Sequence, residues 1–393
     1  MKIPAIERLR AVAIITVYLI HVRLFGDALG YFGQLRRIAS WAGVDLFFVI
    51  SGFVVTLSLE RLLPERPPHP LREPIAEQDA RAMRSFYVRR LFRLAPMASF
   101  ALLLHLAGSL VAPRFAPSTL FLTPKEWAFE AAAVCTGLYN FVAPYLERMA
   151  MAFFWTLSVE EQFYLLLPML FVLAGTRTAR TVVAAAVLVG VAAVLRPLFS
   201  PDSFQIAHCS SQYRFDALAA GVVLGLQRHR IAAVAGRIPR PVRIALVLVS
   251  LGVIVAIPTR AGERFALHNG LVLIWMASAC LVALAFHDSR DVLDVPVLSP
   301  LLEFVGKRSY AIYVVHTAFL FLDDTVLRAT SGRAHALLSS MSGQSIRFVV
   351  CAGIVIAVAD LAHRYVELPF MAMGKRYVSR RAGLPRTALD AAA

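Results

Sequence analysis

Two stretches of the sequence place ionisable residues inside apolar runs, where charged side chains are rare. RLRAVAIITVYLIHVRLF contains Arg10 and His21, and WTLSVEEQFYLLLP contains Glu160 and Glu161. An imidazole can accept a proton from a substrate near neutral pH, and a carboxylate beside it can fix its tautomer and stabilise its charged form. These residue types therefore indicate general-base chemistry at a depth where ionisable groups are functional candidates.

Helical geometry predicts a shared face for Arg10 and His21 but not for the two glutamates. The eleven steps from Arg10 to His21 turn a helix by about 1100°, roughly 20° beyond three full turns, over a rise of about 16 Å. Arg10 would lie at the inner membrane boundary and His21 in the outer half. Adjacent residues point about 100° apart, so only one of Glu160 and Glu161 can face a given cavity. A histidine that only bonds a neighbouring helix is the alternative for His21.

Two arginines in FYVRRLFRLAP form a second candidate site. Arg90 and Arg93 are three residues apart, so they project from the same side of one helical turn. Two guanidinium groups at a cytoplasmic mouth suit an anionic ligand such as a phosphate. The alternative is an ordinary basic anchor at the membrane boundary.

Five other ionisable residues, four near the ends of apolar runs and His316 at mid-membrane depth, are expected to form structural ion pairs or to line the mouths of a polar cavity. They are Asp45, Arg214, Asp216, His316 and Glu367. Ser51 in GVDLFFVISGF lacks the G-x-S-x-G elbow of a serine nucleophile, so we expect it to pack with Gly52 against another helix. No Cys pair or Cys/His cluster has metal-site spacing, so no metal is expected.

The composition shows which elements must position these residues. Hydrophobic residues make up 59% of the 393 residues and charged residues 17%, with a mean hydropathy of +0.67. A soluble domain is nearer half apolar and a quarter charged, so the composition excludes a soluble enzyme with one anchor. Long apolar runs also exclude a membrane β-barrel, whose strands alternate. The sequence therefore predicts an all-α polytopic membrane protein.

Most apolar runs are long enough to cross a bilayer. Ten crossings are predicted, at approximately 8–25, 42–62, 86–112, 154–174, 180–197, 213–228, 241–258, 267–287, 303–327 and 345–372. An eleventh run, 124–143, carries Lys125, Glu126 and Glu130, and charges at bilayer depth are costly. We therefore expect 124–143 to be re-entrant or interfacial.

Charge predicts the orientation in the membrane. The net charge of +15 comes mostly from arginines between apolar runs, and basic loops stay in the cytoplasm. The arginine-rich segments 61–93 and 228–243 and both termini are therefore predicted to be cytoplasmic, with Pro64–Arg84 as a loop. This distribution indicates contact with membrane lipids and argues against nucleic-acid binding. No cleavable signal peptide is expected, because the first apolar run lacks a small-residue cleavage site.

Taken in order along the chain, several motifs resemble the acyltransferase-3 family of bacterial membrane O-acyltransferases. They are Arg10 with His21, GVDLFFVISGF, Arg90 with Arg93, WTLSVEEQFYL, RFDALAAG, SYAIYVVH and RYVELP. The resemblance implies transfer of an acyl group, usually acetyl from acetyl-CoA, to a hydroxyl of an extracytoplasmic acceptor, often a glycan such as lipopolysaccharide or capsule. Many members carry an SGNH-hydrolase-like domain, whereas this chain resembles the stand-alone type, with a membrane acyltransferase domain at 1–375 and a short basic cytoplasmic tail at 376–393.

This resemblance gives the site residues expected roles. His21 would remove the proton from the acceptor hydroxyl, because an alcohol is a poor nucleophile at neutral pH. Glu160 would orient or support the imidazole, with Glu161 as second choice. Arg90 and Arg93 would bind the phosphates of acyl-CoA, which is a co-substrate and not a bound cofactor. Direct transfer and a route through an acyl-His21 both remain open.

Arg10 would flank the thioester arm of the donor. The resemblance also implies a multi-pass protein of the bacterial cytoplasmic (inner) membrane. The chief alternative is a proton-coupled transporter or flippase, because a cavity lined by His, Glu and Arg also suits a carrier. The sequence shows no inverted repeat and no matched pair of broken helices of the kind that many transporters have.

Overall fold

A computed structural model of the chain describes residues 3–25, 40–65, 77–116, 119–146, 150–199, 203–260, 265 and 269–382. All regular structure in this part of the chain is helical, which confirms the predicted all-α membrane class. Seven of the described helices are long and apolar enough to cross a membrane. They span Gly43–Leu62, Glu77–Arg114, Phe154–Leu173, Arg177–Phe199, Arg240–Pro258, Ser309–Ala329 and Met341–Arg380.

The other three predicted crossings also fall on helices. These helices are not among the seven, so the total of ten crossings stays a prediction. These helices are α1 (Pro4–Phe25), α10 (Phe215–Gly236) and α13 (Leu271–His287). α13 has 17 residues, which is at the lower limit for a span.

Helix α6 (Phe154–Leu173) shows why such sequences form membrane helices. Phe154, Leu157 and Phe171 are buried in the protein, whereas Leu165 and Leu173 are more than half exposed. A lipid environment matches that apolar outer surface. Because lipid offers the backbone no hydrogen bonds, each N–H and C=O group must be satisfied within the helix.

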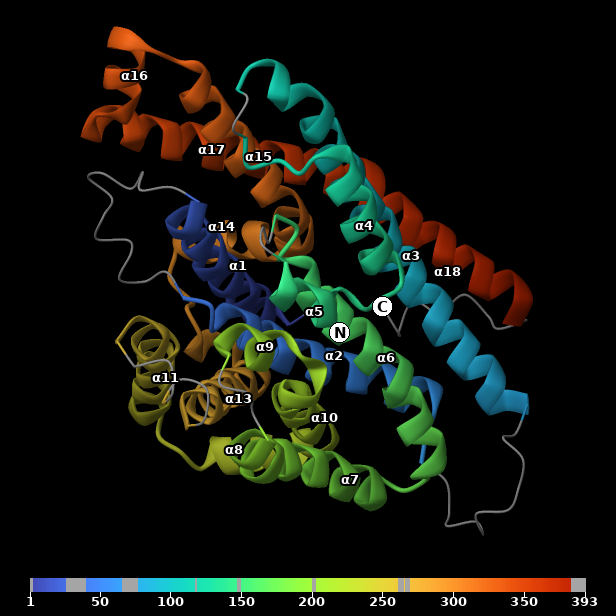
Figure 1. Ribbon diagram of the computed structural model, residues 1–393. Coiled ribbons are helices and arrows are strands. Elements are labelled where there is room, and N and C mark those ends of the chain that lie inside the picture. Colours follow the sequence, from blue (N-terminus) through green and yellow to red (C-terminus); the bar gives the residue numbers. More distant parts are fainter. Residues whose placement is uncertain are drawn as a thin grey trace.

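Helices α1 and α2 (Gly43–Leu62) lie at the centre of the molecule (Figure 1). On one side, α10 packs along α2, α7 (Arg177–Val189) packs along α10, and α13 packs against α11 (Arg240–Arg260). On the other side, α15 (Ser309–Ala329) contacts α1, α3 (Glu77–Val111) and α17 (Met341–Ala362).

Shorter helices complete these two sides. α14 (Leu298–Lys307) packs on α1, and α18 (Leu368–Ala382) runs beside α3. π-helical turns continue α7 into α8 (Arg196–Phe199) and α17 into α18. The remaining short helices include α9 (Phe204–Cys209) and α16 (Gly332–Ser339).

α2 and α10 approach closely because glycines face each other. A Cβ on Gly52 would lie 2.1 Å from the carbonyl oxygen of Leu218, and one on Gly221 would lie 2.2 Å from that of Val49. No side chain fits at such distances, and small residues at helix interfaces permit this close backbone approach. The packing role predicted for Gly52 agrees with this contact.

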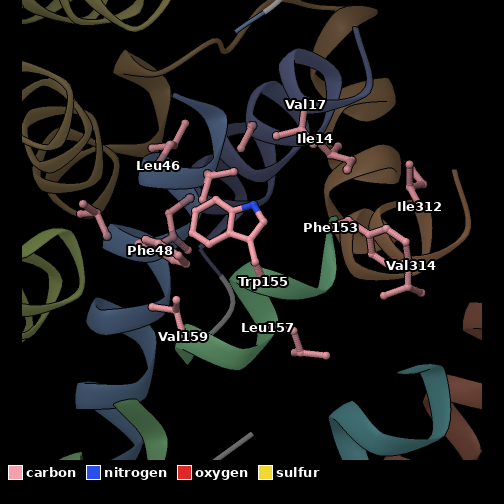
Figure 2. Close-up of a cluster of buried hydrophobic side chains, with 14 of the residues drawn as sticks. Ile14, Val17, Leu46, Phe48, Phe153, Trp155, Leu157, Val159, Ile312 and Val314 are labelled. Atoms are coloured by element: carbon pink, nitrogen blue, oxygen red, sulfur yellow. The ribbon is translucent and has the colours of Figure 1, made fainter. Parts of the chain in front are cut away.

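A hydrophobic cluster around Trp155 joins four of the helices that carry candidate site residues, namely α1, α2, α6 and α15 (Figure 2). All of its labelled members are buried, so this packing fixes the positions of the four helices relative to one another. Besides Trp155 of α6, the cluster includes Ile14 and Val17 of α1, Leu46 and Phe48 of α2, and Ile312 and Val314 of α15.

The segment 124–143 forms two short helices, as expected for a run that does not cross the membrane. α4 (Pro124–Cys135) has 12 residues and α5 (Tyr139–Val142) has four. Twelve residues rise about 18 Å, which is less than the roughly 30 Å of a bilayer core. Between them, Gly137 adopts a positive φ of 68°, which glycine tolerates at a turn.

Three predicted boundaries differ from the structure. The span predicted at 303–327 is wrong at its start: α14 ends at Lys307 and α15 begins at Ser309. The apolar pattern continues through 303–307 because α14 buries its own apolar face against α1. The loop predicted at Pro64–Arg84 is too long, since α3 begins at Glu77; residues 66–76 lie outside the described part.

The predicted boundary between residues 375 and 376 falls inside α18, which continues to Ala382. The remainder of the predicted tail, 383–393, lies outside the described residues.

Candidate active site

A cavity of about 870 Å³, including its open mouth, lies between α1, α2, α3, α6 and α15. The N-terminal half of α6 forms part of its wall, where Thr156, Glu160 and Tyr164 recur at four-residue spacing on one helical face. The rest of its wall is largely apolar. The apolar side chains include Val44, Phe47, Phe48, Ile50, Val54, Leu157 and Val314.

Three arginines line the end of the cavity that the charge distribution predicts to be cytoplasmic: Arg10, Arg90 and Arg93. The guanidinium carbon of Arg90 lies 4.8 Å from the ring centroid of Tyr164, a cation–π geometry. Arg10 donates to a carboxylate oxygen of Glu7 at 2.9 Å. Among the described lining residues Glu160 is the only carboxylate, so the cavity carries net positive charge.

Glu160 faces the cavity and takes part in a chain of hydroxyl groups. The Tyr164 hydroxyl donates to Glu160 Oε2 at 2.9 Å, and the Ser51 hydroxyl hydrogen-bonds to that of Tyr164. Glu161 points elsewhere: its Oε2 lies 3.3 Å from the position of a Cβ on Gly137. The expectation that only one of the two glutamates would face a cavity therefore agrees with the structure.

His21 and His316 lie together, with ring centroids 4.8 Å apart. Nδ1 of His21 lies 2.9 Å from the carbonyl oxygen of Val17, and Nδ1 of His316 lies 2.6 Å from that of Tyr313. A carbonyl oxygen can only accept a hydrogen bond, so each Nδ1 carries the proton. In the neutral imidazole, Nε2 is therefore the basic nitrogen of each ring.

The structure does not bring Glu160 to His21. Among the described residues, the side-chain contacts of Glu160 are with the Tyr164 and Ser51 hydroxyl groups, and the carbonyl of Val17 orients the imidazole of His21. A backbone carbonyl one turn earlier thus fixes the tautomer that the sequence analysis expected a glutamate to fix.

The remaining predicted residues form buried ion pairs nearer the opposite end of the bundle. Arg214 donates to Asp45 at 2.8 Å, and Arg196 pairs with Asp216. All four side chains are almost completely buried. They do not line the cavity, and removing one partner of such a pair would leave an unpaired buried charge. Their geometry therefore matches the structural ion pairs considered for Asp45, Arg214 and Asp216.

Glu367 likewise pairs inside the protein, with Nδ1 of His363 at 2.7 Å.

Four polar residues of the site were missed by the sequence analysis or given another role. Tyr164 follows Glu160 by four residues and Tyr313 precedes His316 by three, so helical spacing could have placed both. Ser51 was expected to pack against a helix, and it instead meets Tyr164 at the cavity. Thr156 had no sequence signal, because its partner Tyr313 belongs to a helix far along the chain.

The chain matches the family described as "Acyltransferase domain" over residues 3–364. It therefore belongs to the acyltransferase-3 family, as its motifs indicated.

Curated relatives support this membership across almost the whole chain. "Putative peptidoglycan O-acetyltransferase YrhL" of Bacillus subtilis is 24% identical over 98% of this chain and 57% of its own length. "Peptidoglycan O-acetyltransferase OatA" of Listeria monocytogenes is 23% identical over 95% and 56%. "O-acetyltransferase OatA" of Staphylococcus aureus is 23% identical over 95% and 58%. The chain thus spans less than two thirds of each of these relatives. No solved structure matches it.

Proposed function

We propose that this protein is a membrane O-acyltransferase that moves an acyl group, in the first instance acetyl, from cytoplasmic acyl-CoA to a hydroxyl of an extracytoplasmic glycan. The cavity carries this proposal. It has three guanidinium groups at one end, and a single layer of side chains separates its other end from His316. Family membership and the relatives' names support acyl transfer to a glycan.

The cavity suits the two unlike halves of acyl-CoA. Its phosphates are multiply charged, and Arg10, Arg90 and Arg93 would bind them, since guanidinium groups form bidentate hydrogen bonds with phosphate oxygens. The uncharged arm would extend along the apolar wall toward the histidines. Glu160, through Tyr164, would act as a positioning residue that holds the ring beneath Arg90.

His21 would act as the general base. The acceptor oxygen attacks the thioester carbonyl carbon, so that a C–O bond forms as the C–S bond breaks. Nε2 of His21 takes the hydroxyl proton, and this proton then passes to the thiolate sulfur, which leaves as CoA–SH. Nδ1 stays bonded to Val17, so the ring keeps the required tautomer throughout. A two-step route through an acyl-His21 would use the same nitrogen.

His316 would support this chemistry as the neighbouring imidazole. We further propose that the protein resides in the bacterial inner membrane with both termini in the cytoplasm. The retention of basic loops on that side supports this orientation.

Mass spectrometry of the host's surface glycans tests the proposal. Peptidoglycan, which two of the relatives' names specify, is the first acceptor to examine. Deleting the gene should remove the mass of one acetyl group per modified site, and the unaltered gene should restore it where the His21→Ala gene does not. Glycans that are unchanged by deletion would contradict the proposal and favour the transporter alternative.

A further inference from the structure

Two aromatic side chains, Phe153 and Tyr313, separate the cavity from the histidine pair; we call them the aromatic partition. Both line the cavity. Their ring centroids also lie 6.0 Å and 5.9 Å, respectively, from that of His316, which is next to His21. His316 is fully buried, and its Nε2 has no hydrogen-bond partner among the described residues. A group that enters by the arginines therefore meets these rings before it meets an imidazole.

The spacing along α15 explains why the partition stands directly in front of the histidines. Tyr310, Tyr313 and His316 follow one another at three-residue intervals, and Tyr310 and Tyr313 both line the cavity. Each interval rises about 4.5 Å, so His316 lies about one helical turn beyond Tyr313 along this face of α15. The long side chain of Tyr313 occupies the space between the cavity and the His316 ring.

Hydrogen bonds and ring contacts hold the partition closed. The Tyr313 hydroxyl donates to the backbone carbonyl of Phe153 at 2.9 Å and lies 2.6 Å from the Thr156 hydroxyl. These bonds tie α15 to the first turn of α6 and to Phe153 just before it. The Phe153 ring packs against that of Phe154, with centroids 4.4 Å apart and the planes tilted by 33°. Passage to the histidines must displace a packed ring, and each further methylene of a passing acyl chain must find room among these packed side chains.

We infer that the aromatic partition selects the acyl group by size: it passes a short acyl thioester and holds back longer chains. This inference rests on the function proposed above, because it assumes that the acyl group travels from the cavity to the histidines. We assign the limit to the partition because its two rings lie between the cavity and His316.

Two substitutions of Phe153 and one control test whether the partition restricts passage while its hydrogen bond stays in place. Phe153→Ala removes a ring but keeps the backbone carbonyl that accepts from Tyr313, so the passage widens while the hydrogen bond stays. Phe153→Leu widens it less and guards against a folding defect in the alanine variant. Leu157→Ala is the matched control, because Leu157 lines the same cavity without belonging to the partition.

The test compares acetyl-, butyryl- and hexanoyl-CoA as donors for the purified full chain in detergent. We expect the unaltered protein and Leu157→Ala to favour acetyl-CoA to the same degree. Phe153→Ala should raise the kcat/KM of hexanoyl-CoA relative to acetyl-CoA by at least about tenfold, the discrimination that one methylene can give in an apolar site. Phe153→Leu should fall between them.

Carbethoxylation of His316 by diethyl pyrocarbonate, followed by mass spectrometry, gives a second readout that does not depend on the donor. His316 should react faster in Phe153→Ala than in Leu157→Ala, while the exposed His335 reacts equally in both.

The outcomes distinguish this inference from the proposed function. If the unaltered protein transfers no acyl group from any CoA thioester, the proposed function is wrong, and the His316 reaction alone decides on the partition. If acetyl transfer proceeds but both Phe153 variants keep the original donor preference, the partition does not select the acyl group. Equal His316 reaction in Phe153→Ala and Leu157→Ala would show that Phe153 is no barrier.

Discussion

The imidazoles of His21 and His316 each donate Nδ1–H to a backbone carbonyl a turn earlier in their own helices. This hydrogen bond decides which nitrogen can act as a base, and it needs no carboxylate. The cost of burying an imidazole is reduced when one of its nitrogens is satisfied in this way. The second nitrogen is then oriented by the helix itself, which is a rigid support for a catalytic group.

Replacing His21 should abolish transfer without loss of the folded protein. A general base contributes about 100- to 10,000-fold to the rate, so we expect His21→Ala to lower kcat by that range while donor affinity changes little. Acetyl transfer by protein reconstituted in liposomes, together with donor binding, measures both quantities. His335→Ala, at an exposed position away from the cavity, is the control. Near-native turnover in His21→Ala would make His316 the next candidate base.

Replacing Arg90 or Arg93 by lysine should weaken donor binding even though the charge is kept. Lysine lacks the planar fork that holds two phosphate oxygens, and it stacks less well than arginine on Tyr164. We expect each variant to lose at least about 1 kcal/mol, or roughly fivefold in Kd for acetyl-CoA. Calorimetry in detergent would measure the change. Unchanged affinity in both lysine variants, with normal insertion, would mean that these arginines only anchor the helix.

Helical spacing predicted part of this site and missed the part that depends on distant helices. The rotation per residue within a single helix places Arg90 and Arg93 on the same side. The same rotation makes Glu160 and Glu161 point in different directions. The partition was not predictable, because Phe153 and Tyr313 lie in separate elements that meet only in the folded chain. For the same reason, the sequence suggested a glutamate beside His21 where the structure has a backbone carbonyl.

At the scale of elements, the contact between α2 and α10 holds one wall of the cavity in place. Gly52 lies next to Ser51, whose hydroxyl belongs to the cavity, so a shift of α2 would move both. The close approach depends on glycine at Gly52 and Gly221, where any Cβ would overlap a backbone carbonyl of the other helix.

Alanine at Gly52 should therefore destabilise the protein. The added methyl group would force α2 and α10 apart, and overpacking of this kind costs about 1–3 kcal/mol. A lower thermal midpoint in detergent is the expected result. Gly252→Ala is the matched control, because a Cβ at that helical position meets no atom within 4 Å; it should leave the midpoint unchanged or raise it slightly. Equal midpoints for the two variants would contradict this account of the interface.

Element boundaries show where an apolar pattern is ambiguous. The two short helices at 124–143 were foreseeable, since charges interrupt that run and Gly137 provides a turn. The break between α14 and α15 was not, because α14 buries its apolar face against α1 and so reads like the start of a span. Periodicity reports which face is buried, and it does not report what covers that face.

At the scale of the whole molecule, the distribution of arginine predicts the orientation of the bundle. In a variant without native cysteines, Phe265→Cys should react with a membrane-impermeant thiol reagent added outside intact cells, and Arg230→Cys should not. Both positions are exposed, so access depends on the side of the membrane. Permeabilised cells, in which both should react, provide the control. Labelling of Arg230→Cys alone in intact cells would overturn the orientation with cytoplasmic termini.

The most direct test of the proposed function is the release of CoA from acetyl-CoA by the purified protein, measured with and without a saccharide acceptor such as soluble peptidoglycan fragments. An acyltransferase must release CoA as it modifies the acceptor, whereas a carrier or flippase releases none. We predict CoA release that requires the acceptor, matches the acetyl groups transferred to it, and disappears in His21→Ala. Acceptor modification without CoA release, or equal release by the unaltered protein and His21→Ala, would contradict this prediction.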